Sequence, residues 1–285
     1  MRIPAALAAT LLVSQSGLAL ADIDKLSGAP LPPQKAERSS PIHDRFYILG
    51  AFYPTQVSTN VRVDPTTGPA AGTMGTPVSA ERDLGLPARI YAGRAEFMFR
   101  LRERNKLRVE YYGVNRSGGK ALANDIVFGN TTFLAGEEVQ TSVSSRAFGL
   151  TYTYSIIHND TFELGTGLGL FGLQAEALGA IPATGQAQDE SAAQMVPTLP
   201  LDLVWCISRR FSLNARGNYV KANVSGYSGS FTDLHGDLQY RWNPYFSLGL
   251  GYTSVRISVS GTSSSFAGVV SASYRGPEAF FRLSY

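Results

Sequence analysis

From residue 44 to the end of the sequence, apolar and polar side chains alternate in short runs. In residues 89–101, "RIYAGRAEFMFRL", the odd positions are mostly apolar, and the even positions carry Arg94, Glu96 and Arg100. An alternation with a period of two predicts β-strands, and no window favours the helical period. The sequence therefore predicts an all-β protein over this region.

Four short polar turns separate these strands: "RERNK" (102–106), "HND" (158–160), "SRR" (208–210) and "NPY" (243–245). The strand before each turn ends in large apolar residues at alternate positions, as in Leu238-x-Tyr240-x-Trp242. Three of the turns are followed by Phe-x-Leu. Apolar and often aromatic residues therefore flank every short turn on one shared face.

The connections at the other ends of the strands are longer and richer in Gly, Ser, Thr and Pro. They are expected near 61–87, 117–138, 175–195, 222–230 and 260–265. Short turns at one end, long loops at the other and an aromatic girdle are typical of outer-membrane barrels. Lipid cannot hydrogen-bond a free strand edge, so spanning strands must close on themselves. The sequence predicts a closed antiparallel transmembrane up-and-down β-barrel.

Ten strands are expected, at about 44–60, 88–101, 107–116, 139–156, 161–174, 196–207, 211–221, 231–242, 246–259 and 266–285. Eight strands are the alternative. The first strand has the weakest pattern, because both faces of "RFYILGAFY" are apolar. The sixth contains Pro197 and Pro200, which predict a bulge or an irregular start, since proline donates no ladder hydrogen bond.

The N-terminus has the pattern of a secretory signal. Arg2 precedes a short apolar run, and Ala19-Leu20-Ala21 fits the small-x-small rule for cleavage. The alternative is a membrane anchor, but the run is too short to cross a hydrocarbon core of about 30 Å as a helix. Residues 1–21 are therefore predicted as a signal peptide. The polar, Pro-rich residues 22–43 are predicted as a flexible periplasmic segment, and 44–285 as the barrel.

Charge and cysteine content exclude several classes. Without Arg2 the chain has 24 basic and 22 acidic residues, a balance too even for a nucleic-acid-binding protein. Cys206 is the single cysteine, so the chain has no intrachain disulfide. No two histidines have the spacing of metal ligands, so neither a metal nor another cofactor is expected.

Charged residues on the polar face of the strands are expected to form a network inside the barrel. Its members are Arg94, Glu96, Arg100, Arg108, Glu110, Glu163, Asp202, Arg216, Arg241 and Arg282. A small barrel is filled by its own side chains, and buried charges must pair, so the network is expected to plug the lumen. The alternative is the charged lining of a narrow channel.

The stretch "DLHGD" is the sharpest catalytic candidate. Asp233, His235 and Asp237 alternate along one strand face, about ten residues from the "NPY" turn and so near the outer rim. A carboxylate beside a histidine orients it and raises its basicity, as general-base catalysis requires. Over these three residues the stretch is similar to the rim of ten-stranded outer-membrane proteases. It lacks their second acid pair, because the nearest acids, Glu81 and Asp83, lie in a loop.

Longer stretches resemble a group of proteobacterial outer-membrane β-barrels of the porin-like superfamily. They are "FMFRLRERNKLRVEYYGVNRSGG", "DIVFGNTTFLAGEEV", "LTYTYSIIHNDTFELGTGLGL" and "GPEAFFRLSY", and the resemblance spans residues 44–285. It implies secretion to the periplasm and insertion into the outer membrane of a Gram-negative bacterium. It implies no catalytic residues. It also implies that the terminal aromatic strand, with Phe281, Leu283 and Tyr285, is the signal that the barrel assembly machinery reads.

Two functional hypotheses follow. The first is a structural or porin-like protein, either a narrow passive pore or a platform whose surface loops bind a ligand. Its partners would be outer-membrane lipid, lipopolysaccharide, the assembly machinery and a small solute or surface ligand. The second is an outer-membrane hydrolase with a rim site at Asp233 and His235.

Overall fold

The computed structural model describes residues 40–285 except 69–70, 182–185, 225–226 and 263–266. The predicted signal peptide, with its cleavage residues Ala19 and Ala21, lies outside the described residues. So does residue range 22–39 of the segment predicted to be flexible.

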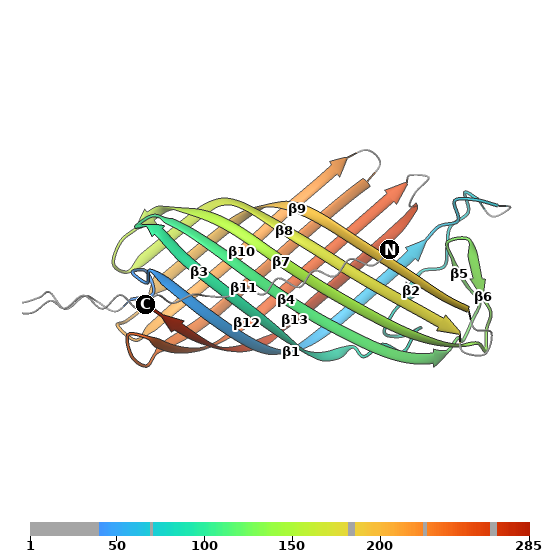
Figure 1. The fold of residues 1–285 in the computed structure, drawn as a ribbon, viewed down its shortest axis with the longest axis horizontal. Helices are drawn as coiled ribbons and strands as arrows, with labels where there is room; N and C mark the ends of the chain where they lie inside the picture. Colours follow the sequence, from blue (N-terminus) through green and yellow to red (C-terminus); the bar gives the residue numbers. More distant parts are fainter. Residues whose placement is uncertain (1–39, 69–70, 182–185, 225–226, 263–266) are drawn as a thin grey trace, which may run out of the picture. The chain divides into compact units, whose positions relative to one another are not determined.

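Ten long strands close into one antiparallel barrel (Figure 1). They are β1 (Phe46–Val63), β3 (Arg89–Arg102), β4 (Asn105–Ala121), β7 (Glu138–His158), β8 (Phe162–Ile181), β9 (Gln186–Cys206), β10 (Phe211–Val224), β11 (Tyr227–Arg241), β12 (Phe246–Thr262) and β13 (Ala267–Ser284). Each strand pairs with the next, and β13 returns to β1 in a register that runs from Tyr47↔Ser284 to Val63↔Gly268. The prediction of a closed ten-stranded barrel is confirmed, and the eight-stranded alternative is wrong.

Several strands extend further toward the long-loop end than their patterns predict. The loop expected at 175–195 is wrong, because β8 continues to Ile181 and β9 begins at Gln186. Their cross-strand pairing continues from Gly169↔Thr198 to Ile181↔Gln186. Backbone hydrogen bonds between strands do not depend on the side-chain pattern, so the pairing persists where the apolar alternation has already stopped.

Three short strands complete the described elements. β2 (Val78–Ser79) pairs with β1, and β5 (Ile126–Phe128) and β6 (Thr131–Phe133) form a separate hairpin. Within the described residues, no helix has the length and hydropathy needed to traverse a bilayer.

Most large apolar side chains lie on the outside of the barrel and most charged side chains inside, where a smaller apolar cluster of Tyr47, Leu49, Ala51, Met98 and Phe280 is also buried. Leu101, Leu168 and Trp242 are more than half exposed, whereas Glu96, Glu110 and similar charges are almost fully buried. Along β3, Tyr91 and Leu101 are ten residues apart. This separation gives an apolar band of about 25 Å for strands tilted by roughly 40°, which matches the lipid-facing band of an outer-membrane barrel.

The two prolines of β9 interrupt its pairing within the strand, whereas the predicted bulge or irregular start is not seen, because β9 begins at Gln186 and the register is the same on both sides of Pro200. The β8–β9 ladder omits Leu199 and Pro200, and the Pro200 carbonyl accepts a hydrogen bond from Thr166 Oγ1 at 2.7 Å instead. On its other side, β9 pairs with β10 only from Cys206 to Leu199. Backbone groups of successive residues point to opposite neighbouring strands, and those of Pro200 point to β8. After Leu199, the next residue whose backbone would pair with β10 is therefore Pro197. Proline has no N–H to donate, so the pairing ends there.

Candidate functional site

A continuous chain of ion pairs crosses the lumen between five strands. The pairs are Arg94–Glu96 (2.8 Å), Glu96–Arg216, Arg216–Glu110 (3.5 Å), Glu110–Arg108 (3.2 Å), Arg108–Asp202 (2.8 Å), Asp202–Lys106 (3.6 Å), Lys106–Glu163 (3.4 Å) and Glu163–Arg100 (2.8 Å). Every one of these side chains is less than a tenth exposed. We call this set the lumen network. It ties β3, β4, β8, β9 and β10 together across the barrel.

Bidentate contacts fix the geometry of the lumen network. Arg108 donates two hydrogen bonds to Asp202, at 2.8 and 3.1 Å, and Arg100 donates two to Glu163, at 2.8 and 3.1 Å. The hydroxyl of Ser155 also donates to Glu163, at 2.5 Å. The carboxylates of Asp202 and Glu163 are therefore each held by an arginine fork inside the lumen.

Glu96 is the junction of the network. Its carboxylate accepts hydrogen bonds from the Tyr47 hydroxyl and from the guanidinium groups of Arg94 and Arg216. Arg94 also donates to Glu278, at 3.0 Å. Loss of the Glu96 charge would therefore leave two buried guanidinium groups without their shared partner.

The short-turn end of the barrel is closed by residues 40–44. Asp44 accepts hydrogen bonds from Arg241 at 2.7 Å and from Arg282 at 2.5 Å, and Ile42 is fully buried. The Arg282 guanidinium also lies over the Tyr47 ring, at 3.7 Å from its centroid. Residues 40–43 belong to the segment predicted to be flexible, but they pack into the mouth of the barrel.

All ten charges expected in the lumen lie on inward faces of their strands. Eight belong to the lumen network, and Arg241 and Arg282 belong to the Asp44 cluster. The sequence reasoning missed Lys106, Asp44 and Glu278. Lys106 is an even number of residues from the inward-facing Arg108 but lies in the predicted turn "RERNK". Glu278 is likewise an even number of residues from Arg282, so the alternation alone identifies Lys106 and Glu278 as inward-facing.

A cavity of about 50 Å³ remains beside the lumen network. Apolar side chains of Leu49, Met98 and Phe280 and polar groups such as Asn214 line it. A cavity of this size has room for a few water molecules.

The Asp233–His235 pair lies inside the barrel, toward the long-loop side of the network. His235 Nε2 is 2.7 Å from Asp233 and 3.0 Å from the Tyr112 hydroxyl, and Nδ1 is 2.9 Å from Thr253 Oγ1. Asp237 contacts Asn214 instead, at 2.6 Å. Asp233 and His235 therefore form a contact pair, and Asp237 is not part of it.

The expected rim position of this pair is wrong. β11 begins at Tyr227, four residues before its predicted start, so Asp233 and His235 lie mid-strand and are almost fully buried. One inward position further toward the long-loop end, Phe231 packs on Phe171 with ring centroids 5.0 Å apart. Both rings are buried and cover the pair.

No metal centre is visible in the described part of the chain, where no three His, Cys, Asp or Glu side chains gather in a way that would hold an ion. The titratable groups of the lumen are engaged with each other instead.

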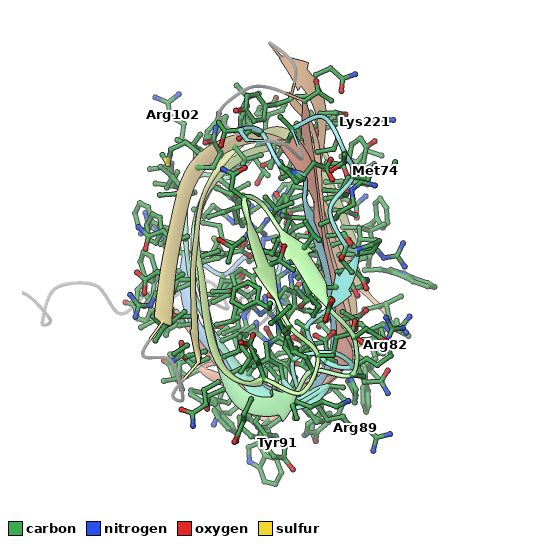
Figure 2. The ribbon with its side chains drawn as sticks, turned by 90° about the vertical axis from the view of Figure 1, so that its right-hand side faces the viewer. Met74, Arg82, Arg89, Tyr91, Arg102 and Lys221 are labelled. Carbon is green, nitrogen blue, oxygen red and sulfur yellow. The ribbon has the colours of Figure 1, made fainter. Side chains whose placement is uncertain are left out.

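A folded cap stands at the long-loop end. Val78, Leu122, Ile126 and Val139 form a buried cluster there. The hairpin β5–β6 is tied to the preceding loop by a hydrogen bond from Thr76 N to Val127 O, at 2.9 Å. Figure 1 shows the hairpin at the end of the barrel, and Figure 2, seen from that end, shows it crossing the barrel's outline. The described parts of the loop between β1 and β3 and of the loop between β4 and β7 are therefore folded against each other.

Replacing Ile126 with aspartate should unfold this cap without unfolding the barrel. A charge inside the apolar cluster costs several kcal/mol, and the cluster is separate from the lumen network. Limited proteolysis should then cut within residues 64–88 or 122–137, while the barrel keeps its heat-sensitive migration in gels. Cleavage no faster than in the exposed control Leu134→Asp would contradict this.

The residues expected to form the assembly signal lie on the outward face of β13. Phe281, Leu283 and Tyr285 are about half exposed or more. Tyr285 N donates to Phe46 O at 2.9 Å, Phe46 N donates to Tyr285 O at 3.0 Å, and the two rings stack with centroids 5.3 Å apart. The terminal strand therefore forms the closing seam, and its role in assembly stays a prediction.

The barrel is similar to solved outer-membrane proteins. It aligns with OmpT, the outer-membrane protease of Escherichia coli, over 84% of this chain and 96% of that chain, with a TM-score of 0.60 and 10% identity. Ail, the attachment invasion locus protein of Yersinia pestis, aligns over 81% and 99% with a TM-score of 0.33 and 10% identity. The P. putida toluene transporter TodX aligns over 87% and 91%, with a TM-score of 0.31 and 8% identity.

No protein-family model and no curated protein matches the sequence. At 10% identity, the likeness to OmpT shows a shared fold and nothing about activity, and the scores of the other two carry no argument. The chain has the fold of a bacterial outer-membrane β-barrel, and the resemblance to a particular group of barrels stays a prediction.

Proposed function

We propose that this protein is an integral outer-membrane barrel with a closed lumen that acts through the surface of its long-loop end. The observation that carries the proposal is the lumen network, whose buried and paired side chains cross the barrel between five strands. The Asp44 cluster at the short-turn end and the Phe171–Phe231 layer add two further obstructions. The folded cap then offers an ordered surface for a ligand or partner.

Liposomes that contain the purified protein should swell no faster in small sugars and amino acids than protein-free liposomes. The matched variant is Arg108→Ser/Asp202→Ser, which removes both members of one pair and leaves neither charge alone. Lys106 keeps its contact with Glu163, and Arg216 keeps its contact with Glu110. Swelling of this variant alone would place the main barrier at the lumen network, and no swelling of either protein would place a further barrier at the Asp44 cluster or the Phe171–Phe231 layer. Solute-dependent swelling of the wild type would support the narrow pore instead.

Hydrolysis is the second candidate function. Its supporting observation is the 2.7 Å contact between His235 and Asp233, which is the geometry of an oriented general base. OmpT, whose fold the chain shares, is a protease. The burial of the pair beneath Phe171 and Phe231 stands against it, because a substrate needs a path to His235. Peptide hydrolysis by refolded protein that disappears in His235→Ala but persists in the buried control Asn214→Ala would favour the enzyme.

A further inference from the structure

Four neighbouring strands carry only one sign of charge on their outward faces. On β12, β13, β1 and β3 the charged residues of the described chain that do not face the lumen are Arg62, Arg89, Arg102, Arg256 and Arg275, and no acid is among them. Arg102 lies at the short-turn end of β3, and Arg62 is paired with Asp64 at 2.9 Å. The other three are exposed, and in the described part of the chain their guanidinium groups have no ion-pair partner. We call Arg89, Arg256 and Arg275 the basic row.

The sheet register brings the basic row together. Gln56 of β1 pairs with Arg89 on one side and with Arg275 on the other. Neighbouring strands are about 4.8 Å apart, so the backbones of these two arginines are roughly 10 Å apart. Arg256 lies two residues beyond Ser254, the partner of Arg275, and is therefore its diagonal neighbour on the same face. Three long cationic side chains and one amide thus share a patch that one headgroup can span.

The height of the row matches the polar edge of a membrane. Arg89 lies one outward position beyond Tyr91, whose exposed ring stacks on Phe52 with centroids 5.3 Å apart. Figure 2 shows Arg89 and Tyr91 both pointing away from the barrel wall. Aromatic side chains of this kind mark the membrane interface, and Tyr91 lies at the upper limit of the band of about 25 Å described above. The basic row is therefore at the level of lipid headgroups on the long-loop side.

We propose that the basic row binds the phosphate groups of a phosphorylated glycolipid in the outer leaflet. This inference rests on the proposed outer-membrane location. Arginine is suited to the role, because its planar guanidinium donates two parallel hydrogen bonds to phosphate oxygens. Gln56, between Arg89 and Arg275, adds an amide donor for the sugar or phosphate. The apolar wall below, with Phe52 and Tyr91, receives the acyl chains.

The test measures lipid affinity of the full-length protein in neutral detergent micelles. The probes are purified diphosphoryl lipid A, the same lipid with both phosphates removed, and inorganic phosphate. The variant is Arg89→Gln/Arg256→Gln/Arg275→Gln, and the control is Arg102→Gln, an exposed arginine at the other end of β3. We expect the triple variant to bind diphosphoryl lipid A at least about tenfold more weakly, because charge-assisted hydrogen bonds are lost. The control should bind like the wild type.

Three results would overturn the inference. They are equal affinity of the triple variant and the wild type, equal affinity of the wild type for the dephosphorylated lipid, and inorganic phosphate binding as tight as lipid A. Heat-dependent gel migration shows that each variant is folded before it is tested. Because micelle binding does not depend on whether the lumen conducts, an open lumen would refute the proposed function and leave this result unaffected.

Discussion

Replacing Glu96 with glutamine should lower the free energy of unfolding by about 3–5 kcal/mol, the usual cost of removing one partner from a buried ion pair. Glu96 accepts hydrogen bonds from Tyr47, Arg94 and Arg216, and both arginines are buried. Glutamine keeps the size but not the charge, so Arg94 and Arg216 keep only Glu278 and Glu110 as partners and repel each other across the site. Urea titration of protein folded in lipid vesicles, followed by gel migration, measures the loss.

The exposed pair Arg82–Asp83 is the matched control. Its atoms are 2.9 Å apart, but the arginine side chain is three-quarters exposed. Asp83→Asn should therefore cost less than about 1 kcal/mol, because water replaces the lost contact. Equal losses in Glu96→Gln and Asp83→Asn would mean that the lumen network does not stabilise the barrel.

Deleting Tyr285 should strongly reduce the amount of protein that reaches the outer membrane. The deletion removes the backbone hydrogen bonds to Arg45 and Phe46 and the ring stacked on Phe46. These contacts together contribute roughly 2–4 kcal/mol to the closing seam. If the terminal aromatic is also the assembly signal, the defect should be larger in cells than in detergent refolding. Membrane fractionation and refolding yield measure the two separately.

Tyr245→Ala is the control for this deletion. Tyr245 is an exposed aromatic in a short turn at the same end of the barrel, and its ring makes no closing contact with β1. It should insert almost normally. Normal insertion of the chain without Tyr285 would contradict the assembly signal, and an unchanged refolding yield would contradict a contribution of Tyr285 to the closing seam.

The alternation of inward and outward positions along each strand is the most informative property of the sequence. Lipid outside and packed charges inside force one face of every strand to be apolar, so the inward position of Arg94, Asp202 and Arg216 could be predicted before any pairing was known. Which charge meets which could not be predicted, because partners such as Arg108 and Asp202 are 94 residues apart and the contact depends on barrel closure.

The missed features have other physical causes. Asp44 lies at the start of the first predicted strand, where both faces are apolar and the alternation is weakest, so no sequence pattern predicts its contacts with Arg241 and Arg282. The cap around Ile126 is held by a small cluster in loops that were identified only by composition. The rim position predicted for His235 is wrong because the predicted strand begins at residue 231, whereas β11 begins at Tyr227. The rim is therefore farther from the "NPY" turn than the pattern predicts.

The central claim is that the lumen is closed, and the conductance of single molecules in planar lipid bilayers tests it most directly. Wild-type protein should insert and stay electrically silent in molar salt. Discrete openings of Arg108→Ser/Asp202→Ser alone would place the main barrier at the lumen network, and silence of both, with insertion verified, would place a further barrier at the Phe171–Phe231 layer. Steady, discrete openings of the wild-type barrel would contradict the closed lumen.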